Sequence, residues 1–96
     1  MIFSVMKYQA VTDHLSCELQ GESVILNMKN GRYYGINTVG SSIWAAIQNP
    51  SSFEDIRSAI LNEYDVTEDV CQREIKTFLD KMVQEELVIT FDEAAC

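Results

Sequence analysis

Apolar and polar residues alternate with a period of two from residue 14 onwards, and this pattern predicts β-strands. In residues 14–19 the odd positions are apolar and the even positions polar, which indicates a strand with one buried face. A short turn leads to residues 23–28, where both faces carry apolar residues, as suits the middle strand of a sheet. Residues 1–12 have no clear period and are expected to form a flexible or loosely packed lead-in.

The pair Asn30-Gly31 is the strongest local turn signal in the chain. A type I′ hairpin turn needs positive φ at both central residues, which Asn tolerates and Gly adopts freely. The strand before this pair and residues 32–36 should therefore pair antiparallel. The three predicted strands then form a meander, and the last of them is exposed at one edge.

Helical periodicity replaces the strand pattern after residue 36. Asn37 or Thr38 can cap a first helix, because a short polar side chain accepts from the free N–H groups of the first turn. Trp44 falls in the buried stripe of that helix. A second helix is predicted to open at Ser51, with a capping box to Glu54.

A third helix is predicted from Thr67, with two acidic residues in its first turn where they favour the helix dipole. Its apolar stripe is wider than one sheet contact requires, so one flank could line a groove. The apolar positions are Val70, Cys71, Ile75, Phe78, Leu79, Met82 and Val83. Residues 87–91 should form a short strand or extended segment before a polar tail.

This order of elements predicts an α+β fold that is winged helix-turn-helix-like: a three-stranded antiparallel sheet followed by three helices. The 96 residues are enough for one domain with a single modest core. We expect a flexible N-terminal lead-in over residues 1–12, the domain itself over 13–91 and a C-terminal tail over 92–96.

Charge argues against nucleic acid as a partner. The chain has 15 acidic and 7 basic residues and a formal net charge of -8, whereas binding to phosphate backbones depends on Lys and Arg. The first residues lack the pattern of a signal peptide, and no segment is apolar enough to span a bilayer. We therefore expect a cytoplasmic protein that binds neither nucleic acid nor membrane.

Catalytic and metal-binding patterns are not evident in the sequence. The three cysteines are widely spaced, and His14 has no second ligand at helical or hairpin spacing. Cys17 alternates to the strand face opposite His14, so this nucleophile and base should point apart. Cys17 and Cys71 are instead expected on apolar faces as small hydrophobic residues. We predict no enzymatic activity, no metal site and no cofactor.

The tyrosines of the third strand have two interpretations. Tyr34 and Ile36 share one face, and Tyr33 and Gly35 share the other. Aromatic residues are common both as strand formers and as interface anchors, so one tyrosine could pack in the core while its neighbour shields the sheet or binds a partner. Gly35 indicates either a bulge or the close approach of another backbone. An exposed edge of this kind can accept a peptide as an added strand.

The segment from Ser23 to Trp44, with its Gly-Arg-Tyr-Tyr turn and the Ile43-Trp44 pair, resembles the PqqD-like family. The Tyr64-Asp65-Val66 loop and the terminal segment 85–88 add to the resemblance, which covers about residues 13–90. Members of this family are winged-helix-like peptide-binding modules, known as RiPP recognition elements, that capture the leader of a ribosomally made precursor. Stand-alone members of this length are similar to the leader-binding proteins of lasso-peptide biosynthesis or to the small chaperone of pyrroloquinoline quinone biosynthesis.

The resemblance implies a non-catalytic adaptor whose partners are a precursor peptide and a separate processing enzyme, such as a leader protease. The leader would add as a strand beside the third strand, with side chains in a groove bordered by the third helix. The expected peptide-binding residues are Arg32, Tyr33, Tyr34, Gly35, Ile36, Val70, Arg73, Glu74, Thr77 and Phe78.

Three alternatives stay open. A winged-helix DNA-binding regulator would need a basic recognition helix, yet the third helix combines basic with acidic residues: Arg73, Lys76 and Lys81 with Glu68, Asp69, Glu74 and Asp80. A peptide chaperone for a radical enzyme, of the pyrroloquinoline quinone type, would use the same groove for a different pathway. A structural subunit of a larger enzyme would bind no peptide at all.

Overall fold

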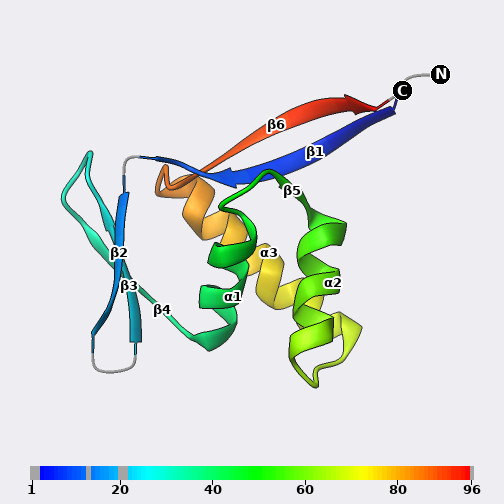
Figure 1. Cartoon of the computed structure of the whole chain (residues 1–96), viewed down its shortest axis with the longest axis horizontal. Helices are drawn as coiled ribbons and strands as arrows, with labels where there is room; N and C mark the ends of the chain where they lie inside the picture. The colour runs from blue at the N-terminus through cyan, green and yellow to red at the C-terminus, as the bar shows by residue number, and fades with distance from the viewer. Residues whose placement is uncertain (1–2, 13, 20–21, 96) are drawn as a thin grey trace.

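The computed structural model describes residues 3–12, 14–19 and 22–95, which form two small antiparallel sheets and three helices (Figure 1). In chain order the elements are β1 (Phe3–Ala10), β2 (His14–Leu19), β3 (Glu22–Asn27), β4 (Tyr33–Ile36), α1 (Thr38–Ala46), β5 (Ser51–Ser52), α2 (Phe53–Glu63), α3 (Glu68–Gln84) and β6 (Val88–Ala95). The predicted α+β class is confirmed, and a three-stranded sheet followed by three helices is part of it. The predicted turn at Gln20-Gly21 and the terminal Cys96 lie outside the described residues.

The first sheet is the predicted meander, with strand order β2-β3-β4. Ile25 of β3 pairs with Tyr34 of β4, so both side chains face the helices. The hairpin turn differs from type I′, because only Gly31 has positive φ (72°) and its N–H donates to the carbonyl of Asn27 at 2.8 Å. A loop that ends in a left-handed glycine is the other common way to close a hairpin.

The second sheet corrects the expectations for both ends of the chain. Residues 3–10, predicted as a loose lead-in, form β1, which pairs with β6 from Ala10↔Val88 to Phe3↔Ala95. The predicted polar tail from residue 92 is therefore strand as far as Ala95. A third, two-residue strand, β5, pairs with the other side of β1 at Lys7 and Tyr8. The ribbon of β1 and β6 extends beyond the helices (Figure 1), and Met6 and Ile89 are each 50% exposed. These strands form through backbone pairing. They lack the regular alternation of buried and exposed residues by which a strand is recognised in a sequence.

Short polar side chains begin all three helices. Asn37 caps α1 by accepting from the N–H of Gly40 at 2.7 Å, as expected. The capping box of α2 is one residue later than predicted: Ser52 and Asp55 form it. Ser51 is buried, and its hydroxyl donates to the carbonyls of Ala46 and Asn49 at 2.9 and 3.0 Å, so it does not cap the helix.

The core lies between the helices and the inner face of β3 and β4. Trp44 is buried, as predicted, and the helices contribute mainly branched aliphatic side chains. The core residues of the three helices are Ile43, Trp44, Ile56, Ile60, Cys71, Ile75, Leu79 and Met82. Packing of α3 against this core fixes its position opposite β4.

Strand β2 presents the face opposite to the one predicted. Leu15 is 58% exposed and Cys17 is exposed, whereas the His14 ring packs edge-on against Trp44 with 4.9 Å between centroids. The outer face has its own apolar row, because Leu15, Leu26 and Tyr33 are cross-strand neighbours. The clean alternation of β2 therefore marks an exposed apolar row rather than a buried one, and the side chain of Leu19 lies outside the described residues.

Candidate functional site

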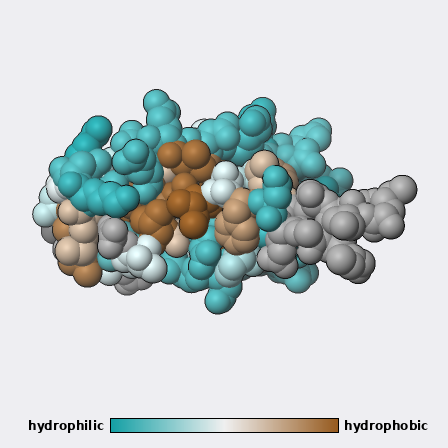
Figure 2. Space-filling model, turned by 90° about the horizontal axis from the view of Figure 1, so that it is seen from above, coloured by the Kyte–Doolittle hydropathy of each residue, from teal (hydrophilic) through white to brown (hydrophobic). Residues whose placement is uncertain are grey.

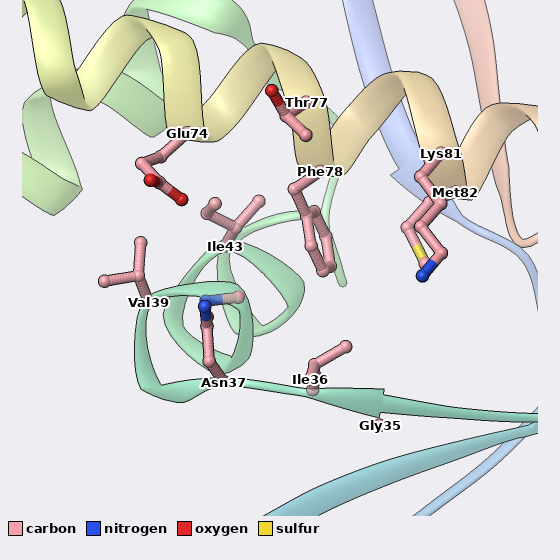
Figure 3. Close-up of a pocket in the computed structure, with 11 residues that line it drawn as sticks. Gly35, Ile36, Asn37, Val39, Ile43, Glu74, Thr77, Phe78, Lys81 and Met82 are labelled. Atoms are coloured by element: carbon pink, nitrogen blue, oxygen red, sulfur yellow. The ribbon is translucent and has the colours of Figure 1, made fainter.

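A cavity of about 170 Å³ opens between β4, the start of α1 and α3 (Figure 3). Its floor comes from the end of β4 and its wall from one face of α3. The lining residues are Gly35, Ile36, Asn37, Val39, Gly40, Ile43, Glu74, Thr77, Phe78, Lys81 and Met82. Apolar side chains therefore line its depth, with an acidic and a basic group on α3 at its rim. We call this cavity and the adjoining edge of β4 the β4–α3 groove.

The edge of β4 beside this cavity has no strand partner among the described residues, because β4 pairs with β3 alone. The N–H of Asn27 donates to the carbonyl of Arg32, which fixes the alternation of the ladder. In an antiparallel ladder every second residue turns its N–H and C=O away from the partner strand. On β4 these are Tyr33 and Gly35, so the free edge presents their backbone groups next to the cavity.

A glycine in α1 makes room for the aromatic ring of the groove. A Cβ at Gly40 would lie 3.1 Å from Cε2 of Phe78 and 3.3 Å from Cβ of Ile36. Both neighbours line the cavity, so a larger residue at this position would displace the Phe78 ring. The close approach of α1 to α3 therefore sets the shape of the cavity.

A polar cluster fastens β4 to the C-terminal end of α3. The hydroxyl of Tyr34 donates to Oε2 of Glu85 at 2.6 Å, and Nη1 of Arg32 lies 3.6 Å from the same oxygen. Nδ2 of Asn27 donates to the backbone carbonyl of Glu85 at 3.0 Å. The hydrogen bond to Glu85, together with burial, raises the pKa of the Tyr34 phenol above its ordinary value. This cluster holds one end of the groove in place.

Half of the predicted site residues line the cavity: Gly35, Ile36, Glu74, Thr77 and Phe78. Arg32, Tyr33 and Tyr34 lie along β4 or just before it, without lining the cavity itself. Val70 and Arg73, which were also predicted, are on α3 outside the lining.

Sequence reasoning missed the contribution of α1 and the last turns of α3 to this lining. Val39 and Gly40 follow β4 directly, so their position depends on how sharply the chain turns into α1. Lys81 lies seven residues after Glu74, which places both on one face of a helix. That spacing was readable from the sequence once α3 was known to line the site.

The described residues offer neither a metal site nor a membrane-spanning helix. They contain no group of three or more His, Cys, Asp and Glu side chains placed to hold a metal ion. Within the same part of the chain, no helix combines the length and apolar character needed to cross a bilayer.

Comparisons with known proteins agree on one family. The sequence profile described as Coenzyme PQQ synthesis protein D (PqqD) matches residues 22–88. The solved structure of TbiB1 in complex with the TbiA(beta) leader peptide is 30% identical, with a TM-score of 0.73 over 83% of this chain and 93% of that one. Lasso peptide synthetase B1 complexed with the leader peptide has the same TM-score at 16% identity, over 85% and 96% of the two chains, and shares the fold.

No curated protein was found to match the sequence. The profile match spans more than half of the chain and includes β3, β4 and all three helices, the elements that build the groove. On this evidence, and in agreement with the resemblance seen in the sequence, the chain belongs to the PqqD family.

Proposed function

We propose that this protein is a non-catalytic adaptor that binds the leader of a ribosomally made precursor peptide and delivers it to a separate processing enzyme. The observation that carries this proposal is the unpaired edge of β4 beside the cavity formed with α3. Family membership supports it, as do the two similar proteins, both solved in complex with a leader peptide.

The groove offers two kinds of interaction to an extended peptide. The backbone groups of Tyr33 and Gly35 can pair with the peptide main chain, and each such hydrogen bond contributes about 0.5–1.5 kcal/mol net. Alternate peptide side chains would enter the cavity, where one buried apolar anchor contributes about 1.5–3 kcal/mol before association costs. A dissociation constant of about 1 μM corresponds to about 8.2 kcal/mol, so binding that tight would require further buried anchors in addition to these contacts.

An adaptor role is consistent with the chemistry of the described residues. The His14 ring lies against Trp44, and its Nδ1 donates a hydrogen bond to the carbonyl of Val11 at 2.6 Å, which occupies one of the ring nitrogens. The buried Cys71 thiol has a pKa raised by desolvation, which disfavours the reactive thiolate. Neither residue lines the groove, and the chemistry would belong to the partner enzyme.

Replacing Tyr33 with proline tests strand addition at this edge. Proline removes the outward N–H but leaves the ladder to β3 intact, because that N–H points away from β3. Binding of a precursor leader peptide should weaken about tenfold or more, measured by isothermal titration. Tyr33→Ala is the matched control, since it removes the exposed ring and keeps the N–H. Equal binding by folded Tyr33→Pro and Tyr33→Ala variants would exclude pairing at this edge.

Delivery to a second enzyme has its own test. An adaptor must hold leader and enzyme together, so the protein, a leader peptide and its processing enzyme should form a ternary complex in size-exclusion chromatography. Competition between leader and enzyme for this protein would contradict delivery while leaving leader binding intact. Duplex DNA serves as the negative control in the same titrations, because the net charge of -8 opposes contact with phosphates.

A further inference from the structure

Two opposite charges stand on α3 at the two ends of the groove. Glu74 and Lys81 both line the cavity, and Figure 3 shows them on the same side of α3 with Phe78 between them. Both side chains are exposed, and neither takes part in an ion pair within the described part of the chain. The other charged pairs of α3, such as Lys76 with Asp80, lie outside the lining.

The surroundings of these two residues keep the ends of the groove electrically different. The helical neighbours of Glu74, three and four residues away, are all uncharged: Val70, Cys71, Thr77 and Phe78. At the other end, Lys81 is followed one turn later by Glu85, whose carboxylate is engaged by Tyr34 and Arg32. The Glu74 end of the groove is therefore negative. The opposite end carries two basic side chains, Lys81 and Arg32, and one carboxylate, Glu85, which already has hydrogen-bonding and ionic partners.

The direction of an added strand follows from the sheet. Figures 1 and 3 agree that β4 runs opposite to α3, with Gly35 near the Lys81 end of the groove and Asn37 near the Glu74 end. Both strand pairs of this sheet are antiparallel, and antiparallel pairing is the slightly more stable arrangement. A peptide added antiparallel to β4 would therefore run parallel to α3, from Glu74 towards Lys81.

Helix and strand geometry then set the spacing. Lys81 lies seven positions after Glu74, a rise of about 10.5 Å along α3. This distance corresponds to about three residues of a strand, and side chains on one strand face recur every second residue. The peptide residue that faces Glu74 and the one that faces Lys81 must therefore be two or four positions apart. With a separation of four, the residue midway between them faces Phe78.

We propose that Glu74 and Lys81 select peptides by the order of their charges: a basic residue first, an acidic residue two or four positions later, and an apolar residue between them when the separation is four. This inference rests on the proposed peptide-binding function and names the ligand class of the same groove. Complementary charges at the rim of an interface fix register and discourage wrong partners. A peptide with the acidic residue first would place like charges next to each other at both ends of the groove.

A displayed library of random 15-residue peptides tests the charge order without a known ligand. Wild-type protein should enrich basic-before-acidic peptides over the reverse order by roughly tenfold, because attraction becomes repulsion at two exposed sites. The variant Glu74→Lys/Lys81→Glu keeps the net charge and should invert the preference. The variant Lys76→Glu/Asp80→Lys makes the same exchange outside the groove and should leave the preference unchanged. Circular dichroism establishes that both variants are folded.

Synthetic peptides from the selection provide the second measurement. One enriched peptide and its charge-swapped version are titrated against wild-type protein and against the Glu74→Lys/Lys81→Glu variant. Each protein should bind its matching order more tightly. Enrichment with no order, or an order that the exchange does not invert, would overturn this inference alone. If the Tyr33→Pro variant enriches the same peptides as wild-type, or if no peptide is enriched, the proposed function fails as well.

Discussion

The two sheets of this protein differ in the interactions that hold their strands in place. Strands β2, β3 and β4 pack against the helices, and Ile25 and Tyr34 on their inner face are buried. The ribbon of β1 and β6 is joined mainly by its own backbone ladder. Figure 2 shows the face on that side of the molecule, where hydrophobic residues gather in the middle and hydrophilic residues surround them. Burial fixes the position of β4 closely, and the groove depends on that position.

This contrast indicates which elements must be positioned accurately for the groove to form. The wall of the groove is α3, which is anchored in the core by Ile75, Leu79 and Met82. The ribbon contacts the helical layer near its base, where Ala10 and Val88 are buried. Nζ of Lys7 also lies 3.8 Å from Oδ2 of Asp55 in α2. We therefore expect substitutions near β4 to affect both stability and binding, and those in the outer ribbon to affect neither strongly.

The largest difference should appear between core and ribbon truncations. Ile25→Ala removes a fully buried side chain from β3 and should lower the free energy of unfolding by about 2–5 kcal/mol. Met6→Ala in β1 removes a half-exposed side chain and should cost less than about 1 kcal/mol. Urea denaturation followed by circular dichroism gives both values. Similar losses would mean that the ribbon is as strongly coupled to the fold as the core.

Two phenylalanines offer a matched comparison for binding. Phe78 lines the groove and Phe91 lies on β6, and both are partly buried. Phe78→Ala should weaken the leader by about 1.5–3 kcal/mol through loss of an apolar contact, whereas Phe91→Ala should leave affinity unchanged. Isothermal titration of the two folded variants measures this. A loss of affinity in Phe91→Ala would place part of the peptide site on the ribbon.

A smaller effect is expected at the polar cluster. Tyr34→Phe removes the donor to Glu85 and should destabilise the protein by about 1–2 kcal/mol. Because the folded-state pKa of Tyr34 is raised, this stabilisation is fully present below the ordinary tyrosine pKa of about 10 and is lost as pH rises through the raised value. Denaturation midpoints between pH 7 and about 11 should fall in wild-type protein and fall less in the variant. Parallel pH curves would contradict the role of this hydroxyl.

The smallest effect concerns the joint between α3 and β6. Glu86 has a φ of 61°, and Leu87 donates to the carbonyl of Met82, which closes the helix with a left-handed residue. Glu86→Gly relieves the strain of an L-residue in that conformation and should stabilise the protein by about 0.5–1 kcal/mol. Thermal unfolding would show a slightly higher midpoint. A lower midpoint would mean that the Glu86 side chain contributes more than its backbone costs.

Much of the helix-backed half of the fold could be predicted, because burial leaves a periodic pattern in the sequence. The Asn30-Gly31 signal located the hairpin, and the cap at Asn37 and the burial of Trp44 are confirmed. The pairing of β1 with β6 could not be predicted, since backbone hydrogen bonds between half-exposed strands require no particular residues. The face of β2 was wrong for a related reason, because an exposed apolar row such as that of Leu15 resembles a buried one.

The candidate site was predicted in part. The resemblance located β4 and one face of α3, and Glu74, Thr77 and Phe78 do line the cavity. The contribution of Gly40 could not be foreseen, because it depends on how closely α1 packs against the Phe78 ring of α3 rather than on any local pattern. The elements that form the site could therefore be predicted from the sequence, whereas the way they pack against one another could not.

The unpaired edge of β4 also has a consequence for copies of the protein in solution. An open strand edge is a template for another chain of the same kind, and two such edges could join one molecule to the next. Here the edge strand has only four residues, and the net charge of -8 makes copies repel one another. The acidic surface thus acts against self-association, and it leaves the edge available to a peptide that carries less negative charge.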